Sequence, residues 1–420
     1  MTLDSLAGKL QQITNNLKRN RYINAISEGL ISLFPVLMVG AFFSIFNGLA
    51  WDPWKNFLDS TGLKTLVSLP VTFTTNLISL YASFAVAYKF SESCEKDGYI
   101  AGFISMISFL LLTPLAEDGH IATTYLGAAG MFASFVVALA VSTIYVYMVN
   151  KNMVIKMPKG VPSTTAKSFT ALIPLFAVVL FDLAVYFLFK ATSFGSIHGL
   201  IYSFLQVPLS KLGNTFLVFL FLKFLTNVLW VFGIHGGLVM YSIAVPLWLS
   251  MDYANTAAYA EGSPLPFILG YAFGMLFFQP TGTGNTIGLN ILMLRAKSKR
   301  YKTLGKLALP SSIVGVNEPI LFGTPIVMNP TLVVPFIVHP LLCGTIAYFL
   351  TLAGILPRLN GVFMFGIPVG LSGFIAGGWR VALFQLLMIP FSYICYAPFF
   401  KKMDEEAYSE ELAAETQNAD

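Results

Sequence analysis

Long apolar runs separated by short polar segments dominate the chain. A membrane-spanning helix needs roughly 20 mostly apolar residues, and the runs that approach or exceed this length lie at residues 30–51, 71–90, 99–115, 124–150, 171–190, 215–230, 331–356 and 381–400. Residues 237–315 are interrupted by polar and glycine-rich segments, so the spans within them are hard to count. Together with the eight runs above, we expect about ten membrane spans. The pattern predicts an all-α integral membrane protein with re-entrant hairpins and amphipathic interfacial helices.

Three segments depart from this pattern. In residues 1–23 apolar positions recur at spacings of three and four, which predicts an amphipathic helix on the inner membrane surface. Residues 191–212 are too polar to cross but keep a weak amphipathic rhythm, so we place there the connector between an N-terminal half (1–190) and a C-terminal half (213–402). The tail, residues 403–420, is acidic, and its composition predicts a frayed or disordered cytoplasmic segment.

The composition agrees with a membrane protein. Hydrophobic residues make up 56% of the 420 positions and charged residues only 11%, against about 25% charged in ordinary soluble domains. The mean hydropathy is +0.73. The first 20 residues lack an apolar core, so we expect no cleavable signal peptide.

Basic residues mark the loops expected in the cytoplasm. They gather in four places, at residues 9–21, 151–159, 295–306 and 401–402. Acidic segments without Lys or Arg, at 116–120 and 252–261, suit the opposite side. The positive-inside rule then places both termini in the cytoplasm and requires an even number of spans. Because the basic runs adjoin apolar spans and the net charge is only +5, we favour this topological interpretation over nucleic-acid binding.

The cysteines and histidines give no sign of a metal centre or a disulfide framework. They are isolated from one another, without a CxxC pair, and comprise Cys94, Cys343, Cys395, His120, His198, His235 and His339. We therefore predict no metal and no cofactor.

The second half of the chain contains unusual polar segments inside apolar flanks. They are "FGIHGGLVM" (232–240), "QPTGTGNTIGLN" (279–290), "GVNEPILFGTP" (315–325) and "FGIPVGLSGFIAGGW" (365–379). Unpaired backbone groups cost several kcal/mol each in lipid, so these segments must be buried in protein or line a cavity. Broken helices of this kind build substrate sites in transporters. The alternative is that they are helix kinks with small residues for close packing.

Glu318 is the leading candidate for a functional residue. A carboxylate inside the membrane is costly, so its presence favours function over a structural cap or a distant ion pair. Pro319 suits the first turn of a helix, which places Glu318 near a helix start with Asn317 facing the same cavity. A carboxylate and an amide together supply the acceptors and donors that sugar hydroxyls require.

Further polar and aromatic residues accompany this motif. His235 lies between glycines, which indicates close backbone approach, and its role is equally open to a binding and a structural interpretation. Trp230 is a candidate for stacking on a sugar ring or for the core. Thr283 and Asn285, in the glycine-rich segment, are candidates for binding sugar, whereas the lack of a Gly-Lys-Ser/Thr ending argues against a nucleotide loop.

Two intramembrane charges, Asp182 and Lys223, have simpler explanations. They are candidates for an ion pair between helices, and Lys223 is also long enough to snorkel toward the interface. We favour a structural role for both.

The segments "GVNEPILFGTPIVMNP", "KGVPSTTAKSFTALIP" (159–174), "FGIHGG" and "PTGTGNTIGL" resemble the membrane (IIC) subunit of the bacterial phosphoenolpyruvate-dependent sugar phosphotransferase system, lactose/cellobiose/diacetylchitobiose family. The resemblance covers almost the whole chain. It implies a multi-pass homodimer in the bacterial inner membrane, with an N-terminal dimerisation domain and a C-terminal transport domain that moves as a body, an elevator mechanism.

The resemblance also implies the chemistry. It implies that the carboxylate matching Glu318, the catalytic candidate, and the imidazole matching His235 bind the sugar. A separate phosphorylated IIB subunit, supplied by IIA and HPr upstream, then phosphorylates the sugar, because no segment here is long enough for a fused IIB domain and the chain has no phospho-carrier residue of its own. Whether such a translocating subunit counts as an enzyme stays open.

One position departs from the family pattern. Many relatives carry Trp in a "PWT" segment where this chain reads "MFGIPVG", with Phe365 at the aligned position. Stacking on a sugar survives in weaker form, but the indole N–H donor is lost, which leaves the identity of the sugar open.

The sequence favours a permease that translocates a β-linked disaccharide of the cellobiose, diacetylchitobiose or lactose type. An ion-coupled secondary sugar transporter is the alternative, with Glu318 or Asp182 carrying a proton. An intramembrane hydrolase or glycosyltransferase is a third reading, but it lacks the expected spacing of nucleophile or metal ligands.

Overall fold

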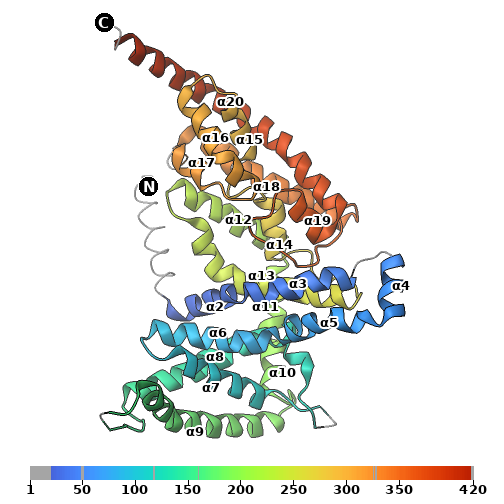
Figure 1. The fold of residues 1–420 in the computed structure, drawn as a ribbon, viewed down its shortest axis with the longest axis vertical. Coiled ribbons are helices and arrows are strands. Elements are labelled where there is room, and N and C mark those ends of the chain that lie inside the picture. Colours follow the sequence, from blue (N-terminus) through green and yellow to red (C-terminus); the bar gives the residue numbers. More distant parts are fainter. Residues whose placement is uncertain are drawn as a thin grey trace. The chain divides into compact units, whose positions relative to one another are not determined.

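The structure, a computed structural model, describes residues 20–48, 52–116, 119–158, 160–324, 326 and 329–417. The amphipathic helix predicted at the N-terminus lies largely outside these residues. Within them the chain is built of helices with two isolated β-bridges and no extended strand (Figure 1). The prediction of an all-α protein is thereby confirmed.

The chain separates into two compact units. We call them the N-terminal unit, made of the described residues of Thr14–Gly213 and Tyr241–Pro266, and the C-terminal unit, made of those of Asn214–Met240 and Phe267–Asp420. Helix α13 (Gly236–Ala260) begins in the C-terminal unit and ends in the N-terminal unit. The chain therefore passes between the units three times.

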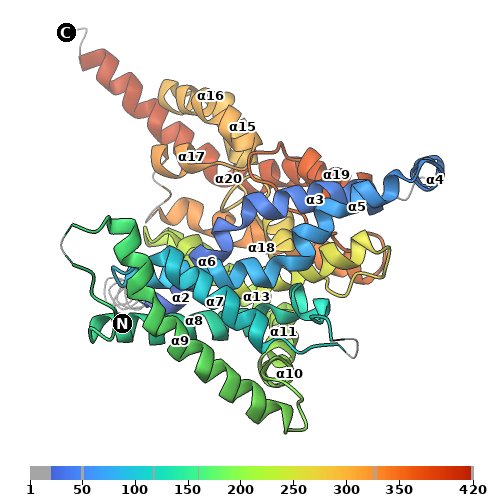
Figure 2. The same cartoon turned by 60° about the horizontal axis from the view of Figure 1, so that its bottom comes forward.

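The other helices of the N-terminal unit follow one another closely along the chain. They are α2 (Arg21–Ser32), α3 (Phe34–Gly48), α4 (Asp52–Thr61), α5 (Leu63–Phe73), α6 (Ile78–Ser93), α7 (Gly98–Leu112), α8 (Met131–Asn150), α9 (Ser163–Lys190), α10 (Ile197–Ile201) and α11 (Val207–Gly213). Helices α6, α7 and α8 lie side by side in both views (Figures 1 and 2). Small residues let them approach closely: Ser105 Oγ donates to the carbonyl of Ser83 at 2.9 Å, and Ala138 of α8 is fully buried.

The first predicted span is bent. The apolar run at 30–51 begins inside α2 and continues into α3, and the two helices meet at an angle of 41°. Pro35 lies in the first turn of α3, where it has no N–H to continue the hydrogen-bond ladder of α2. The helix also starts earlier than the apolar run, because Asn20 Oδ1 caps it by accepting from the amides of Tyr22 (3.0 Å) and Ile23 (3.2 Å).

Five helical stretches of the described residues are long and apolar enough to cross a bilayer. They are Leu63–Ser93, Ala128–Asn150, Thr165–Lys190, Thr331–Leu352 and Trp379–Thr416, and the number rises to seven if two further bent pairs of helices each cross once. The count of about ten expected from the sequence therefore stays a prediction.

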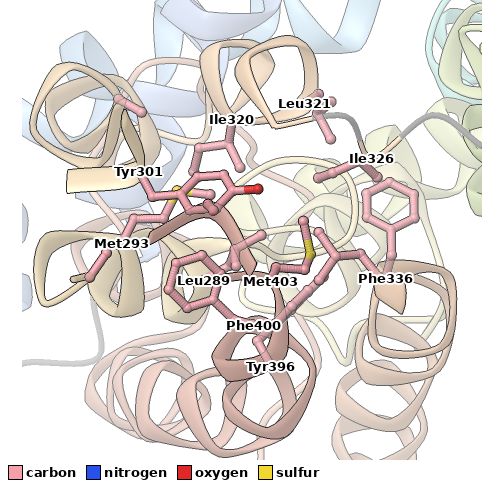
Figure 3. Close-up of a cluster of buried hydrophobic side chains, with 14 of the residues drawn as sticks. Leu289, Met293, Tyr301, Ile320, Leu321, Ile326, Phe336, Tyr396, Phe400 and Met403 are labelled. Atoms are coloured by element: carbon pink, nitrogen blue, oxygen red, sulfur yellow. The ribbon is translucent and has the colours of Figure 1, made fainter. Parts of the chain in front are cut away.

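The C-terminal unit holds the segments singled out in the sequence. Its helices are α12 (Phe216–Val231), α14 (Tyr271–Phe273), α15 (Ile287–Leu294), α16 (Lys299–Ile313), α17 (Glu318–Gly323), α18 (Pro330–Leu352), α19 (Leu371–Gly377) and α20 (Trp379–Gln417). A buried apolar cluster joins α15, α16, α17, α18 and α20 (Figure 3). Its centre includes Leu289, Ile320, Phe336 and Tyr396, each with no exposed surface. Close packing there fixes the position of the short helix α17, which carries Glu318.

The acidic tail is helical in the structure, contrary to the expected disorder. Helix α20 continues to Gln417, and its acids bind the start of α16, where the first amides of a helix lack intrahelical partners. Asp404 accepts from the amides of Lys297 (2.8 Å) and Ser298 (3.0 Å). Glu411 accepts from Ser298 Oγ (2.7 Å) and from the amides of the next two residues (2.8 and 3.0 Å). The acids thus cap a helix instead of solvating a tail.

We expect Asp404→Ala to loosen this cap. Loss of a charged acceptor destabilises the local structure by about 2 kcal/mol, which makes opening at the amides of Lys297 and Ser298 roughly thirtyfold more frequent. Hydrogen exchange followed by mass spectrometry measures this. The matched control is Glu405→Ala, an exposed acid on the same turn. Equal exchange in the two variants would show that Asp404 does not hold the segment.

Candidate functional site

Three segments of the C-terminal unit meet around the Asn-Glu-Pro motif. They are the glycine-rich loop at 279–286, the turn at 314–318 and the segment at 363–372, and all three border one small cavity of about 60 Å³. The amide of Val369 donates to the carbonyl of Ile313 at 2.9 Å, which joins the third segment to the end of α16. The cavity has room for about two water molecules. It is therefore a gap where the three segments pack together, and it is too small for a sugar.

The glycine-rich loop has a left-handed backbone that its side chains hold in place. Residues Gly282, Gly284 and Asn285 have φ values of 90°, 80° and 50°, a region that favours glycine. Asn285 is buried, accepts from Thr281 Oγ1 at 2.5 Å and donates weakly to Cys343 Sγ at 3.8 Å. Its side chain is therefore engaged in the loop.

Two side chains of helix α20 form hydrogen bonds with the backbone of the glycine-rich loop and of the start of helix α15. Tyr396 Oη donates to the carbonyl of Gly284 at 2.8 Å, and Ser392 Oγ donates to the carbonyl of Asn285 at 2.8 Å. Ser392 Oγ also accepts from the amide of Gly288 at 3.1 Å, at the start of α15. These two side chains satisfy backbone groups that a glycine-rich loop would leave unpaired in an apolar surrounding.

Asn317 ties the loop to the helix that carries Glu318. Its side chain is 2% exposed, and its Nδ2 donates to the carbonyl of Thr283 (2.7 Å) and to Thr286 Oγ1 (2.8 Å). Thr283 itself is half-buried. Both hydrogen bonds of the Asn317 side-chain amide are therefore made within the protein. This suits a residue that positions its neighbour, Glu318.

Glu318 begins α17, with Pro319 in the first turn as the sequence predicts. In contrast to the expected burial, the residue is exposed. The first turn of α17 thus lies at the surface of the unit, although Ile320 and Leu321 of the same helix are buried. A carboxylate at a helix start is stabilised by the helix dipole, and this one is exposed and therefore accessible.

His235, Trp230 and Phe322 form an aromatic group in the same unit. The rings of Trp230 and His235 lie 4.4 Å apart at 49°, and those of Trp230 and Phe322 lie 6.3 Å apart. Trp230 is 4% exposed while His235 is half-buried. The geometry therefore favours Trp230 as a support for the imidazole. Phe322 is on α17, four residues after Glu318, so one short helix connects the carboxylate to this group.

Close backbone approach explains the glycine after His235, as the sequence predicts. A Cβ added to Gly236 would lie 1.9 Å from the carbonyl of Thr226 on α12. Only glycine lets α13 start so close to α12. The imidazole is held at this crossing.

Phe365 is 59% exposed. Its ring contacts Phe363 edge-to-face at 4.7 Å, and Phe363 in turn contacts Tyr271 at 5.8 Å. Phe365 also lines the small cavity beside Val316. An aromatic face is thus fixed near the Asn-Glu-Pro motif.

The other intramembrane charges are not among the residues of this arrangement. Asp182 is buried on α9 in the N-terminal unit. Lys223 is buried on α12, with Nζ about 6 Å over two rings, at 6.0 Å from that of Phe219 and 5.9 Å from that of Phe278. The described residues contain no group of three or more His, Cys, Asp or Glu that could hold a metal ion.

Sequence reasoning missed the supporting residues. Ser392 and Tyr396 lie in an apolar run with no local signal, because their partners are backbone carbonyls more than 100 positions away. Phe322 had a usable signal, since residues four apart share one helix face and it follows Glu318 at that spacing.

Comparison with known proteins identifies relatives over nearly the full chain. The model of the family "Phosphotransferase system, EIIC" matches residues 27–340. The chain is 34% identical to the lichenan permease IIC component of Bacillus subtilis (strain 168), over 97% of this chain and 94% of the relative. It is 31% identical to the cellobiose-specific EIIC component of the phosphotransferase system of Geobacillus stearothermophilus, over 98% and 96%.

A solved structure is similar across the same length. The crystal structure of the transporter ChbC, the IIC component from the N,N'-diacetylchitobiose-specific phosphotransferase system, matches with a TM-score of 0.90 and 32% sequence identity. The match covers 97% of this chain and 99% of that one.

Proposed function

Because the chain belongs to the EIIC family of the phosphotransferase system, membrane-embedded sugar permeases with relatives specific for β-glycosides, we propose that it carries a β-linked disaccharide across the bacterial cytoplasmic membrane. In this proposal both termini lie in the cytoplasm. A separate phosphorylated IIB protein, fed by IIA and HPr, phosphorylates the sugar as it is released. The chain itself supplies the binding site and the passage.

One observation carries this proposal: Glu318 is exposed at the first turn of α17 while the residue before it is anchored inside the protein. An exposed carboxylate whose neighbour is anchored can accept hydrogen bonds from sugar hydroxyls at a fixed position. His235 supplies a second polar group that is partly accessible, and Phe365 supplies an aromatic face. Asn317 and Trp230 act behind them as positioning residues, and Asn285 and Thr283 shape the loop.

The division into two units supports a division of labour. The candidate site belongs to the C-terminal unit, which we propose moves as the transport domain of an elevator mechanism. In the N-terminal unit, only 17% of the 18 most apolar consecutive residues of α9 are buried, and Leu180 and Phe187 are among its exposed side chains. Such a helix requires lipid or a second copy against it, and we propose that the N-terminal unit forms the contact of a homodimer.

Transport coupled to phosphorylation is tested in membrane vesicles. We expect sugar to accumulate as its phosphate when phosphorylated IIB protein is supplied on the cytoplasmic side, and not otherwise. Vesicles without a phosphoryl donor serve as the control. Concentrative uptake driven by a proton or sodium gradient alone would replace the proposal with an ion-coupled transporter.

The sugar class is tested by a binding screen with the purified protein. We expect β-linked disaccharides such as cellobiose, diacetylchitobiose and lactose to include the tightest ligand. Buried polar groups left unpaired by a wrong sugar discriminate strongly, whereas apolar contacts discriminate by only about 1–3 kcal/mol. Tight binding confined to a monosaccharide would remove the two-ring ligand.

The exposed basic cluster at residues 295–306 is proposed to steer the anionic IIB partner. Lys299 is already paired with Glu415 at 2.7 Å, so Lys302 and Lys306, both exposed, are better probes. We expect changing both to Gln to slow phosphorylation about threefold at low salt, with sugar binding unchanged. The difference should vanish at high salt, since screening removes long-range attraction.

The control for this prediction is Lys190→Gln, a basic residue at the end of α9, which we propose faces the opposite side of the membrane. It should leave the phosphorylation rate unaltered. A slower rate that persists at every salt concentration in the Lys302 and Lys306 variant would count against steering.

A further inference from the structure

An apolar groove lies in the C-terminal unit, between the end of α18 and the start of α20. Its volume is about 530 Å³. Apolar side chains form both walls, comprising Leu350, Ile355, Leu356, Leu383, Phe384 and Leu387. Several of them remain exposed in the folded protein; Ile355 is 56% exposed and Leu387 is 54% exposed. These walls offer no polar side chain that could bind a sugar.

Two other lining residues differ from these apolar walls. They are Trp379, which is 64% exposed, and Arg380, whose guanidinium lies 5.5 Å from the centre of the Trp379 ring. One guanidinium nitrogen donates to the carbonyl of Ile355 at 3.4 Å, which holds the group across the gap between the two walls. In the part of the chain that the structure describes, no carboxylate forms an ion pair with Arg380. The residue itself is exposed.

The length of the groove suits the acyl chain of a lipid. From Trp379 to Leu387 the helix advances by about 12 Å at 1.5 Å per residue, which is most of the half-thickness of a hydrocarbon core about 30 Å thick. Tryptophan is enriched at the boundary between the hydrocarbon and the headgroups. A groove that starts at such a residue and descends by this length matches an acyl chain of one leaflet, with Arg380 at the level of its phosphate.

We propose that this groove binds an anionic glycerophospholipid, with one acyl chain between the walls and the headgroup phosphate paired with Arg380. A guanidinium binds phosphate through two parallel hydrogen bonds, and the first turn of α20 adds a favourable dipole. A zwitterionic lipid presents the same phosphate together with a cationic group that Arg380 repels. The site therefore distinguishes headgroups by their charge. It selects lipids over soluble anions because only a lipid has an acyl chain that fills the groove.

Native mass spectrometry of the full-length, detergent-purified protein tests the proposal. Phosphatidylglycerol and phosphatidylcholine with identical acyl chains are the probes. We expect the wild type to retain phosphatidylglycerol preferentially and Arg380→Ala to lose about tenfold in affinity, as for a hydrogen-bonded charge. Arg380→Lys should recover part of the loss. Arg358→Ala, an exposed arginine that does not line the groove, should bind as the wild type does.

A second variant tests the acyl chain. Leu383→Trp fills the groove, and we expect it to lower binding of phosphatidylglycerol while Arg380 is still present. Unchanged elution from a size-exclusion column shows that each variant folds. Equal retention of the two lipids by the wild type, undiminished phosphatidylglycerol binding by Arg380→Ala, or equally good competition by chain-free glycerophosphoglycerol would overturn the proposal.

Discussion

Replacing Glu318 with Gln is expected to weaken sugar binding by roughly ten- to a hundredfold, while the protein stays folded. The substitution keeps the shape but removes the charge, and hydrogen bonds to charged groups contribute about 1.5–3 kcal/mol. The anchor does not depend on this carboxylate, because Asn317 makes it through Thr283 and Thr286. Isothermal titration calorimetry with the purified protein measures the affinity.

The control for this experiment is Glu261→Gln, which removes an exposed acid from the N-terminal unit. It should bind sugar like the wild type. Wild-type affinity in the Glu318 variant as well would assign that carboxylate to the helix start alone, and the binding site would have to be sought around His235.

The second large effect is expected from Gly282→Ala, which disrupts the contact between the glycine-rich loop and Asn317 of the Asn-Glu-Pro motif. The residue has φ of 90°, and an added Cβ would lie 2.2 Å from Asn317 Oδ1. The left-handed backbone alone costs about 1–2 kcal/mol, and displacing Asn317 endangers two hydrogen bonds of about 1 kcal/mol each. We therefore expect a lower melting temperature together with at least tenfold weaker sugar binding.

Gly354→Ala separates the two causes. Gly354 has a similar φ of 73° in the same unit, but nothing lies within 4 Å of an added Cβ. It should lose stability without losing affinity. If both variants bind sugar equally well, contact between the loop and Asn317 is not required for binding.

The positions of the long helices could be predicted because a change from apolar to polar sequence is a local signal. The apolar runs at 124–150 and 171–190 end where the helices do, at Asn150 and Lys190. Their beginnings were less predictable. Helix α9 starts at Ser163, several residues before its apolar run, because a helix continues through polar positions once it has formed.

The candidate site was predictable only in part. Glycine and proline located the loop and the start of α17, because backbone conformation limits which residues fit. The link made by Asn317 left no trace in the sequence, since its partner is a backbone carbonyl 34 positions earlier. The prediction for the tail was wrong for a similar reason. Its acidic composition indicated disorder, whereas Asp404 and Glu411 accept hydrogen bonds from backbone amides more than 100 positions away.

The length of α20 has a practical consequence for anyone who attaches another protein to this chain. Its acids hold the start of α16 as far along as Glu411 and Glu415. A fluorescent reporter joined before Glu411 would therefore remove part of the permease's own folded structure, and reduced expression of such a fusion would be mistaken for toxicity. Joining the reporter after Gln417, through a flexible linker, leaves the helix intact.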